Sequence, residues 1–157
     1  MHQESKIIHA ERFKEVLKHL SYNTELVVDL DYVIILAQHE LGSDFWFEEL
    51  VKHAKHHLQG RDDFMKPVLH VYNAVQHLVK MKPVEQHTAK IINALQDIGI
   101  NVTALTARGH ELKKSTHRQL RDIGIDLTDR IIFCSGKDKG TCYKSYLEYR
   151  GFLNGKK

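Results

Sequence analysis

Two aspartates at the end of an apolar stretch are the residues of this sequence best suited to chemistry. Asp29 and Asp31 lie in the segment ELVVDLDYVIIL, which spans residues 25–36. Side chains two positions apart on a strand point to the same side of the sheet. The two carboxylates can therefore share a metal ion or act together as nucleophile and acid/base. The alternative is structural, since acidic residues often end a strand by capping the next turn.

Hydroxyl and ammonium groups follow at the ends of the next two expected strands. Thr106 comes directly after the apolar run 100–105, with Arg108 close behind, and its hydroxyl can bond to an anionic oxygen. Lys137 and Lys139 precede the last expected helix, where the backbone dipole favours anions. Open parallel sheets bind ligands beyond the carboxyl ends of their strands. The three strand ends together predict a phosphoryl-binding site, with a helix cap at Thr106 and a solvated lysine loop as the alternatives.

The elements that must position these groups alternate between helix and strand. The nearly continuous apolar run 25–36 predicts a strand buried on both faces. Apolar spacing and turn residues predict the other elements, which are a helix over 6–20, two helices within 45–80 separated near 59–63, a helix over 83–98, a strand over 100–105, a helix over 110–123, a strand over 130–134 and a helix over 141–149. This order predicts an α/β fold, a Rossmann-like three-layer sandwich with a parallel sheet.

Composition narrows the class of protein. A chain of 157 residues predicts one domain, and its formal charge of +3, spread along the sequence, argues against nucleic acid as a partner. No stretch is long and apolar enough to span a membrane, and the polar N-terminus resembles neither a signal nor a transit peptide. We therefore expect a cytoplasmic protein in which Cys134 and Cys142 are reduced.

Three segments, in order, resemble motifs of the haloacid dehalogenase (HAD) superfamily. The sequence VVDLDYV at 27–33 is similar to the first motif, ALTARG at 104–109 to the second, and FCSGKDKG at 133–140 to the third. Within the third, Lys139 is the better match because a glycine follows it. The combination looks most like a little-characterised, domain-of-unknown-function branch of that superfamily.

The resemblance implies a reaction and a role for each matching residue. Asp29 would be the nucleophile that forms an aspartyl-phosphate, and Asp31 would protonate the leaving group and later activate water. Thr106 would hold a phosphoryl oxygen, and Lys139 would offset the charge of the transition state. Mg²⁺ would bind the Asp29 carboxylate and the Asp31 main-chain carbonyl. The residues implied to contact a small phosphorylated substrate are Tyr32, Ala107, Arg108 and Lys137.

The resemblance also implies a division of the chain, and here the sequence departs from the superfamily. Residues 1–36 and 82–157 would form the HAD-like core, and 37–81 a helical cap inserted after the first strand. The superfamily's fourth motif, an acidic pair that completes the metal site, has no counterpart, because Glu148 is the only acidic residue after Lys139. We therefore expect a truncated chain that binds Mg²⁺ weakly. Its phosphatase activity would be impaired, and the alternative is an inactive remnant or interaction module.

Two further expectations concern the surface. Without a fourth and fifth strand, the edge of the first strand is open and ready to pair, which predicts a homodimer, a swapped segment or a tail folded over that edge. His53 and His57 are one helical turn apart, a spacing that can bind Zn²⁺. No HExxH motif or cysteine pair accompanies them, so we expect a solvated helix face.

Overall fold

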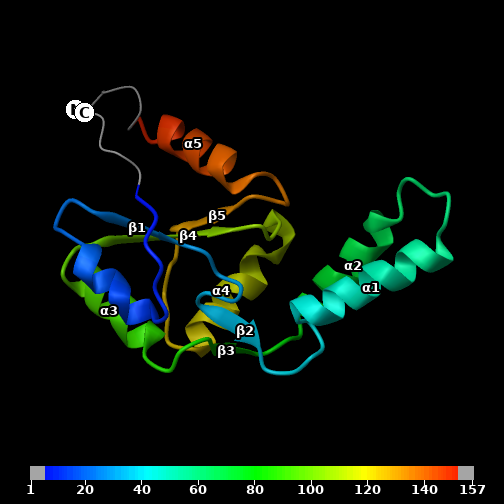
Figure 1. The fold of residues 1–157 in the computed structure, drawn as a ribbon, viewed down its shortest axis with the longest axis horizontal. Coiled ribbons are helices and arrows are strands. Elements are labelled where there is room, and N and C mark those ends of the chain that lie inside the picture. Colours follow the sequence, from blue (N-terminus) through cyan, green and yellow to red (C-terminus); the bar gives the residue numbers. More distant parts are fainter. Residues whose placement is uncertain (1–5, 152–157) are drawn as a thin grey trace.

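A parallel sheet forms the middle layer of the computed structural model, which describes residues 6–151. The sheet has three strands in the order β1-β4-β5, which are β1 (Glu25–Val28), β4 (Asn101–Thr106) and β5 (Ile131–Phe133). In Figure 1, α5 (Lys139–Tyr149) lies over one face, and α3 (Thr88–Asp97) and α4 (Lys113–Asp122) lie over the other. The predicted α/β fold, with a parallel sheet between layers of helices, is confirmed.

The hydrophobic core lies on the side of the sheet that faces α3 and α4. Alternate residues of β1 and its continuation point into it, namely Leu26, Val28 and Leu30. Strand β4 and helices α3 and α4 supply the residues around them. All are buried, namely Val102 and Ala104 of β4, Ile92 and Leu95 of α3, and Leu120 of α4. The α5 side is covered less completely, since Val27 is only half-buried. The prediction of a strand buried on both faces is therefore wrong for the α5 face.

The predicted strand over 25–36 is interrupted after Val28. The Leu30 carbonyl accepts the N–H groups of Ile34 and Ile35, both at 2.9 Å, so the chain turns sharply instead of extending. Strand β2 (Ile35–Ala37) then pairs antiparallel with β3 (Met81–Pro83) in a second, two-stranded sheet. Ile34 and Ile35 are both fully buried. The apolar run thus reflects burial in the core, which a tight turn achieves as well as a strand.

The predicted helix over 6–20 is also shorter in the structure. Only η1 (Phe13–His19) is helical, in the tighter 3₁₀ form. The Glu15 carboxylate accepts the Arg12 N–H at 2.9 Å and so fixes the start of η1. Before it, Ile7 is 87% exposed, and an apolar side chain with no surface to pack against gives a helix no reason to form.

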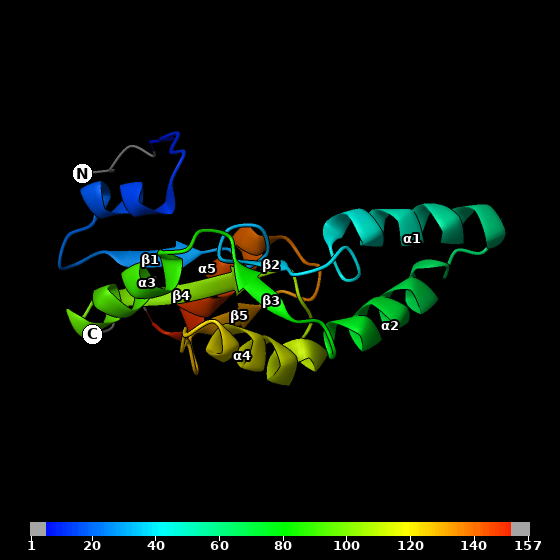
Figure 2. The ribbon, with the colours of Figure 1, turned by 90° about the horizontal axis from the view of Figure 1, so that it is seen from below.

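Two antiparallel helices form a hairpin between β2 and β3. They are α1 (Asp44–His57) and α2 (Met65–Gln76), as predicted, and Figures 1 and 2 show them projecting away from the sheet. Tyr72 packs against Trp46 and Phe47 between the helices. That residues 37–81 act as a cap stays a prediction. Pro83 ends β3 and does not start a helix, because α3 begins only at Thr88.

The second half of the chain follows the predicted order closely. The helix expected over 110–123 consists of η2 (His110–Leu112) and α4, and β5 and α5 begin within two residues of their expected positions. Cys134 and Cys142 are free thiols, as predicted. Among the described residues, no helix has the length and apolar character needed to cross a membrane.

Strand β1 lies at one edge of the sheet. Val28 pairs with Ala104 of β4, and within residues 6–151 no strand pairs with the opposite edge of β1. Figure 2 shows η1 and the segment before it on that open side. That two chains pair through this edge stays a prediction.

We predict that Leu120→Ala lowers the free energy of unfolding by roughly 2–5 kcal/mol, because it leaves a cavity in the core. Leu120 is 1% exposed, whereas Leu78, the matched control, is 83% exposed. Leu78→Ala should change stability by less than about 0.5 kcal/mol. Urea unfolding of both variants tests the placement of the core, and equal losses would contradict it.

Candidate functional site

An ion pair joins the end of β1 to the start of α5. The Lys139 ammonium contacts Asp29 Oδ2, while Asp29 Oδ1 accepts the N–H of Leu30 at 2.8 Å. The two charged side chains are 36% and 37% exposed, so ligands can reach both. The structure therefore brings together the residues that the sequence suggested as nucleophile and balancing cation.

The loop between β5 and α5 sets the position of Lys139. Ser135 and Gly136 both have positive φ, 51° and 74°, which reverses the chain direction after β5. The Asp138 side chain then caps α5 by accepting the N–H of Thr141 at 2.7 Å. Lys139 is therefore the first residue of a capped helix, whose N-terminus carries the positive end of the helix dipole.

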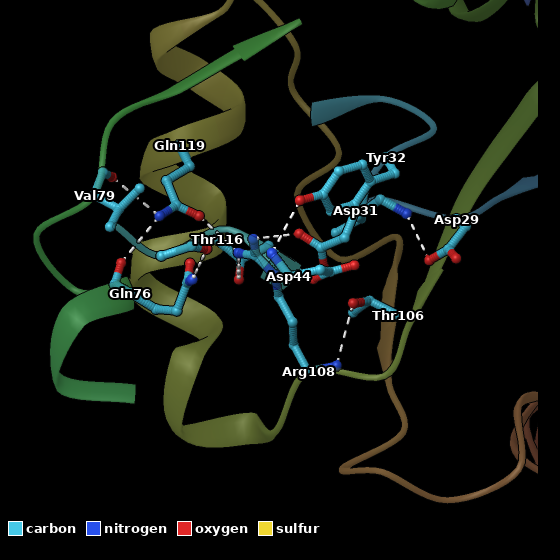
Figure 3. Close-up of polar contacts among 12 residues, drawn as sticks. Asp29, Asp31, Tyr32, Asp44, Gln76, Val79, Thr106, Arg108, Thr116 and Gln119 are labelled. Atoms are coloured by element: carbon cyan, nitrogen blue, oxygen red, sulfur yellow. Dashed lines mark hydrogen bonds and ion pairs between the residues drawn. The ribbon is translucent and has the colours of Figure 1, made fainter. Parts of the chain in front are cut away.

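Asp31 is bound to a buried arginine. Arg108 Nε donates to Asp31 Oδ2 at 2.9 Å and Arg108 Nη2 donates to Asp31 Oδ1 at 2.7 Å, a bidentate pair (Figure 3). The Arg108 side chain is 2% exposed, whereas that of Asp31 is 30% exposed. The Arg108 guanidinium is directed into the protein, where it holds the Asp31 carboxylate. That Arg108 contacts a substrate stays a prediction.

The other side of the Arg108 guanidinium is held by α4. Its Nη1 donates to Gln119 Oε1 at 2.6 Å and to Thr116 Oγ1 at 3.1 Å. Gln119 Nε2 in turn donates to the carbonyls of Gln76 and Val79, at 3.0 and 3.2 Å. Figure 3 shows this chain of contacts running from Asp31 to the end of α2.

Thr116 and Gln119 were not predicted as part of the site, although their spacing in the sequence carries a signal. With Leu120 they lie on one face of α4, at helical spacings of three and four residues. That face is buried, so two polar side chains on it require polar partners. The pattern therefore indicates a polar partner inside the protein, which the structure identifies as Arg108.

Tyr32 connects the Asp29 loop to the helical hairpin. Its backbone has a φ of 61°, which is uncommon for a residue other than glycine, and its ring is half exposed. The Tyr32 hydroxyl accepts the N–H of Asp44, the first residue of α1, at 2.9 Å. Burial raises the pKa of the Asp44 carboxyl, and the negative charges of Asp31 and Glu48 raise it further. No motif or spacing in the sequence predicted that Asp44 lies near Asp31.

The remaining residues predicted for the site differ in how far they are buried. They are Thr106, Ala107 and Lys137. Thr106 is fully buried, and its hydroxyl accepts the Arg108 N–H at 3.2 Å, which leaves the hydroxyl proton available to donate. Ala107 is exposed, and its carbonyl accepts the N–H of Gly136 at 2.9 Å, so the β4 and β5 ends stay together. Lys137 is exposed in the same loop. That these residues contact a substrate stays a prediction.

Oxygen ligands for Mg²⁺ are few. Within residues 6–151, no group of three or more His, Cys, Asp or Glu side chains is arranged to hold a metal ion. His53 and His57 lie close together on α1, but no third ligand of these types joins them among the described residues. Mg²⁺ often uses only one or two carboxylates together with water and substrate phosphate. Asp29 and Asp31 would be the protein ligands of a site of that kind, although each carboxylate is paired with a cation of the chain. That Mg²⁺ binds here stays a prediction.

Comparison with known proteins places the chain in one family. Residues 8–132 match the family described as Protein of unknown function (DUF2608), and the chain belongs to it. No curated protein and no solved structure shows a significant match. The match includes Asp29, Asp31, Thr106 and Arg108, while Lys139 lies beyond it.

This finding corrects the assignment to the HAD superfamily. The family that matches is an uncharacterised one, and nothing in the match indicates HAD membership. The motifs on which the resemblance rested are short and lie at strand ends, where any parallel α/β sheet that binds an anion places acids, hydroxyls and lysines. These motifs therefore reflect the parallel α/β architecture and are no evidence of common ancestry with the HAD superfamily. The expectation of a truncated chain came from the same resemblance and loses its basis.

We predict that Arg108→Met lowers the free energy of unfolding by about 3 kcal/mol or more, because it leaves the Asp31 carboxylate and the buried ends of Thr116 and Gln119 without their partner. Adding Asp31→Asn should cost less in that background than in the wild type, as a double-mutant cycle measures. Arg61 is the matched control, since its ion pair with Asp63 is exposed. Arg61→Met should cost at most about 1 kcal/mol. Equal losses in the free energy of unfolding for Arg108→Met and Arg61→Met would contradict the assignment of Arg108 as the buried partner of Asp31, Thr116 and Gln119.

Proposed function

We propose that the chain is a phosphatase-type hydrolase that transfers the phosphoryl group of a small phosphorylated molecule to Asp29 and then to water. The observation that supports this most directly is the exposed Asp29–Lys139 pair at the carboxyl end of β1. A carboxylate can attack phosphorus only if nearby positive charge offsets the repulsion between two anions. Lys139 and the N-terminus of α5 supply that charge.

The proposed reaction has two steps. In the first, an Asp29 carboxylate oxygen attacks phosphorus, the bond from phosphorus to the ester oxygen breaks, and the leaving oxygen takes a proton from water. In the second, the Asp31 carboxylate, held by Arg108, takes a proton from the water whose oxygen attacks the phosphorus of the acyl phosphate, and then returns that proton to solvent. Inorganic phosphate leaves and the Asp29 carboxylate is restored. Arg108 is a positioning residue, because it holds the Asp31 carboxylate in one orientation through both steps.

Mg²⁺ is the cofactor that we propose for this site. The Asp29 carboxylate and the Asp31 main-chain carbonyl would hold the ion. When bound, Mg²⁺ would offset the negative charge on the phosphoryl oxygens. Two protein ligands are too few to capture a strongly hydrated ion by themselves. The ion and the phosphoryl group should therefore bind together, each increasing the affinity for the other.

We predict that the chain hydrolyses a generic aryl phosphate in the presence of Mg²⁺ and that Asp29→Asn abolishes the reaction. Lys139→Met should lower kcat by roughly 10²–10³, the effect of removing one charged group that stabilises a transition state. Asp63→Asn, an exposed acid far along the chain, is the control and should leave the rate unchanged.

Rapid quenching followed by mass spectrometry of peptides should locate one added phosphoryl group on Asp29. Equal rates for the wild type and Asp29→Asn would rule out this mechanism.

We also predict that Mg²⁺ alone binds weakly and that inorganic phosphate tightens its binding. Isothermal titration calorimetry with each ligand, alone and with the other present, measures this coupling directly. Asp29→Asn should remove most of it, and a chelator should stop hydrolysis. Tight binding of Mg²⁺ without phosphate would show that the ion has further ligands and would contradict the site as described.

A second candidate function is an interaction module without catalysis. It is favoured by the fact that Asp29 and Asp31 are each already paired with a cation of the same chain. A site whose charges are balanced internally is stable without a ligand. Inactivity of the wild type towards aryl phosphate and no phosphoryl group on Asp29 would favour this alternative.

A further inference from the structure

A groove of about 640 Å³ runs along the open edge of β1 and ends at Asp29. Its volume lies in the range of small-molecule sites in proteins. Val27 and Val28 line it on the strand side, and Tyr32 and Val33 line it where the chain turns after Asp29. The groove therefore meets the proposed phosphoryl site at one end.

The wall opposite β1 is formed by the segment before η1 and is held in place. Ile8 lines the groove from this segment. The N–H of Phe13 donates to Glu85 Oε1 at 2.7 Å, which ties the start of η1 to the loop after β3. Val84 of that loop also lines the groove, and its N–H donates to the Ile34 carbonyl at 3.0 Å. Three segments distant in sequence thus enclose one space.

Apolar side chains that line the groove are unusually exposed. Ile8 is 47% exposed, Tyr32 49% and Val33 40%, and all three border the same groove. Apolar surface left open beside a charged site is typical of a ligand-binding site. Tyr32 also has a backbone conformation that is uncommon for residues other than glycine, with a φ of 61°, and such conformations occur often at ligand-binding sites.

We infer that this groove binds an apolar or aromatic leaving group of a phosphate monoester whose phosphoryl group lies at Asp29. The inference rests on the proposed function and adds the class of substrate to it. Continuity with Asp29 is what favours a substrate over other occupants. A peptide strand or a second copy of the chain pairing with β1 would need no acidic residue at the end of the groove.

Two phosphonates, which cannot be hydrolysed, test the inference by calorimetry on the full chain with Mg²⁺ present. Naphthylmethylphosphonate should bind at least about tenfold more tightly than methylphosphonate, since a desolvated ring adds that much affinity. Inorganic phosphate should displace both.

Ile8→Ser should weaken the binding of naphthylmethylphosphonate about fivefold and leave that of methylphosphonate unchanged. Ile7→Ser is the matched control, because Ile7 is the neighbouring residue, is 87% exposed and does not line the groove. It should bind both phosphonates as the wild type does.

The outcomes separate this inference from the proposed function. Equal affinities for the two phosphonates would overturn the groove assignment, even if Asp29 is phosphorylated by an aryl phosphate. A preference for the naphthyl compound that Ile8→Ser reduces would support the groove, even if no phosphoryl group is ever found on Asp29. Equal affinities together with a dimer that Ile8→Ser dissociates would assign the groove to a second copy of the chain.

Discussion

The buried Arg108 guanidinium is the constraint on which the site depends. Removing such a charge from water costs several kcal/mol unless every side of it is paired. Asp31 satisfies one edge of the guanidinium, and Thr116 and Gln119 satisfy another. The loop after β1 must therefore bring its second aspartate inward, and α4 must present polar side chains to the protein interior. The aspartate at position 31 and the polar residues on the buried face of α4 are both explained by one buried charge.

The same network fixes the helical hairpin relative to the site. Gln119 bonds to the carbonyl of Gln76, and the Gln76 side chain donates to the Gly42 carbonyl at 2.8 Å, just before α1. Gly42 has a φ of 86°, and a Cβ there would lie 2.5 Å from a Val79 methyl group, so only glycine allows this close approach. Contacts thus continue from Asp31 through Arg108 and Gln119 to the residues that flank the two helices of the hairpin.

The residues that meet at the carboxyl edge of the sheet were predictable from this sequence, whereas the turn within the apolar run 25–36 was not. Asp29, Thr106 and Lys139 were located correctly because parallel strands all end at the same edge of their sheet. The break after Val28 could not be predicted, because Ile34 and Ile35 are apolar in a turn as they would be in a strand. Membership of a superfamily could not be inferred either, since short motifs at strand ends recur wherever this architecture binds anions.

The two ion pairs divide the site into a fixed half and an exchangeable half. The Asp31–Arg108 pair is closed from solvent on the arginine side, which is 2% exposed, so breaking it would leave a buried charge alone. The Asp29–Lys139 pair is more than one third exposed on both sides, and such pairs contribute only about 0–1 kcal/mol. Under the proposed function, Lys139 would turn from Asp29 towards the phosphoryl group at little cost. The pairing that balances Asp29 without a ligand is therefore compatible with the proposed reaction.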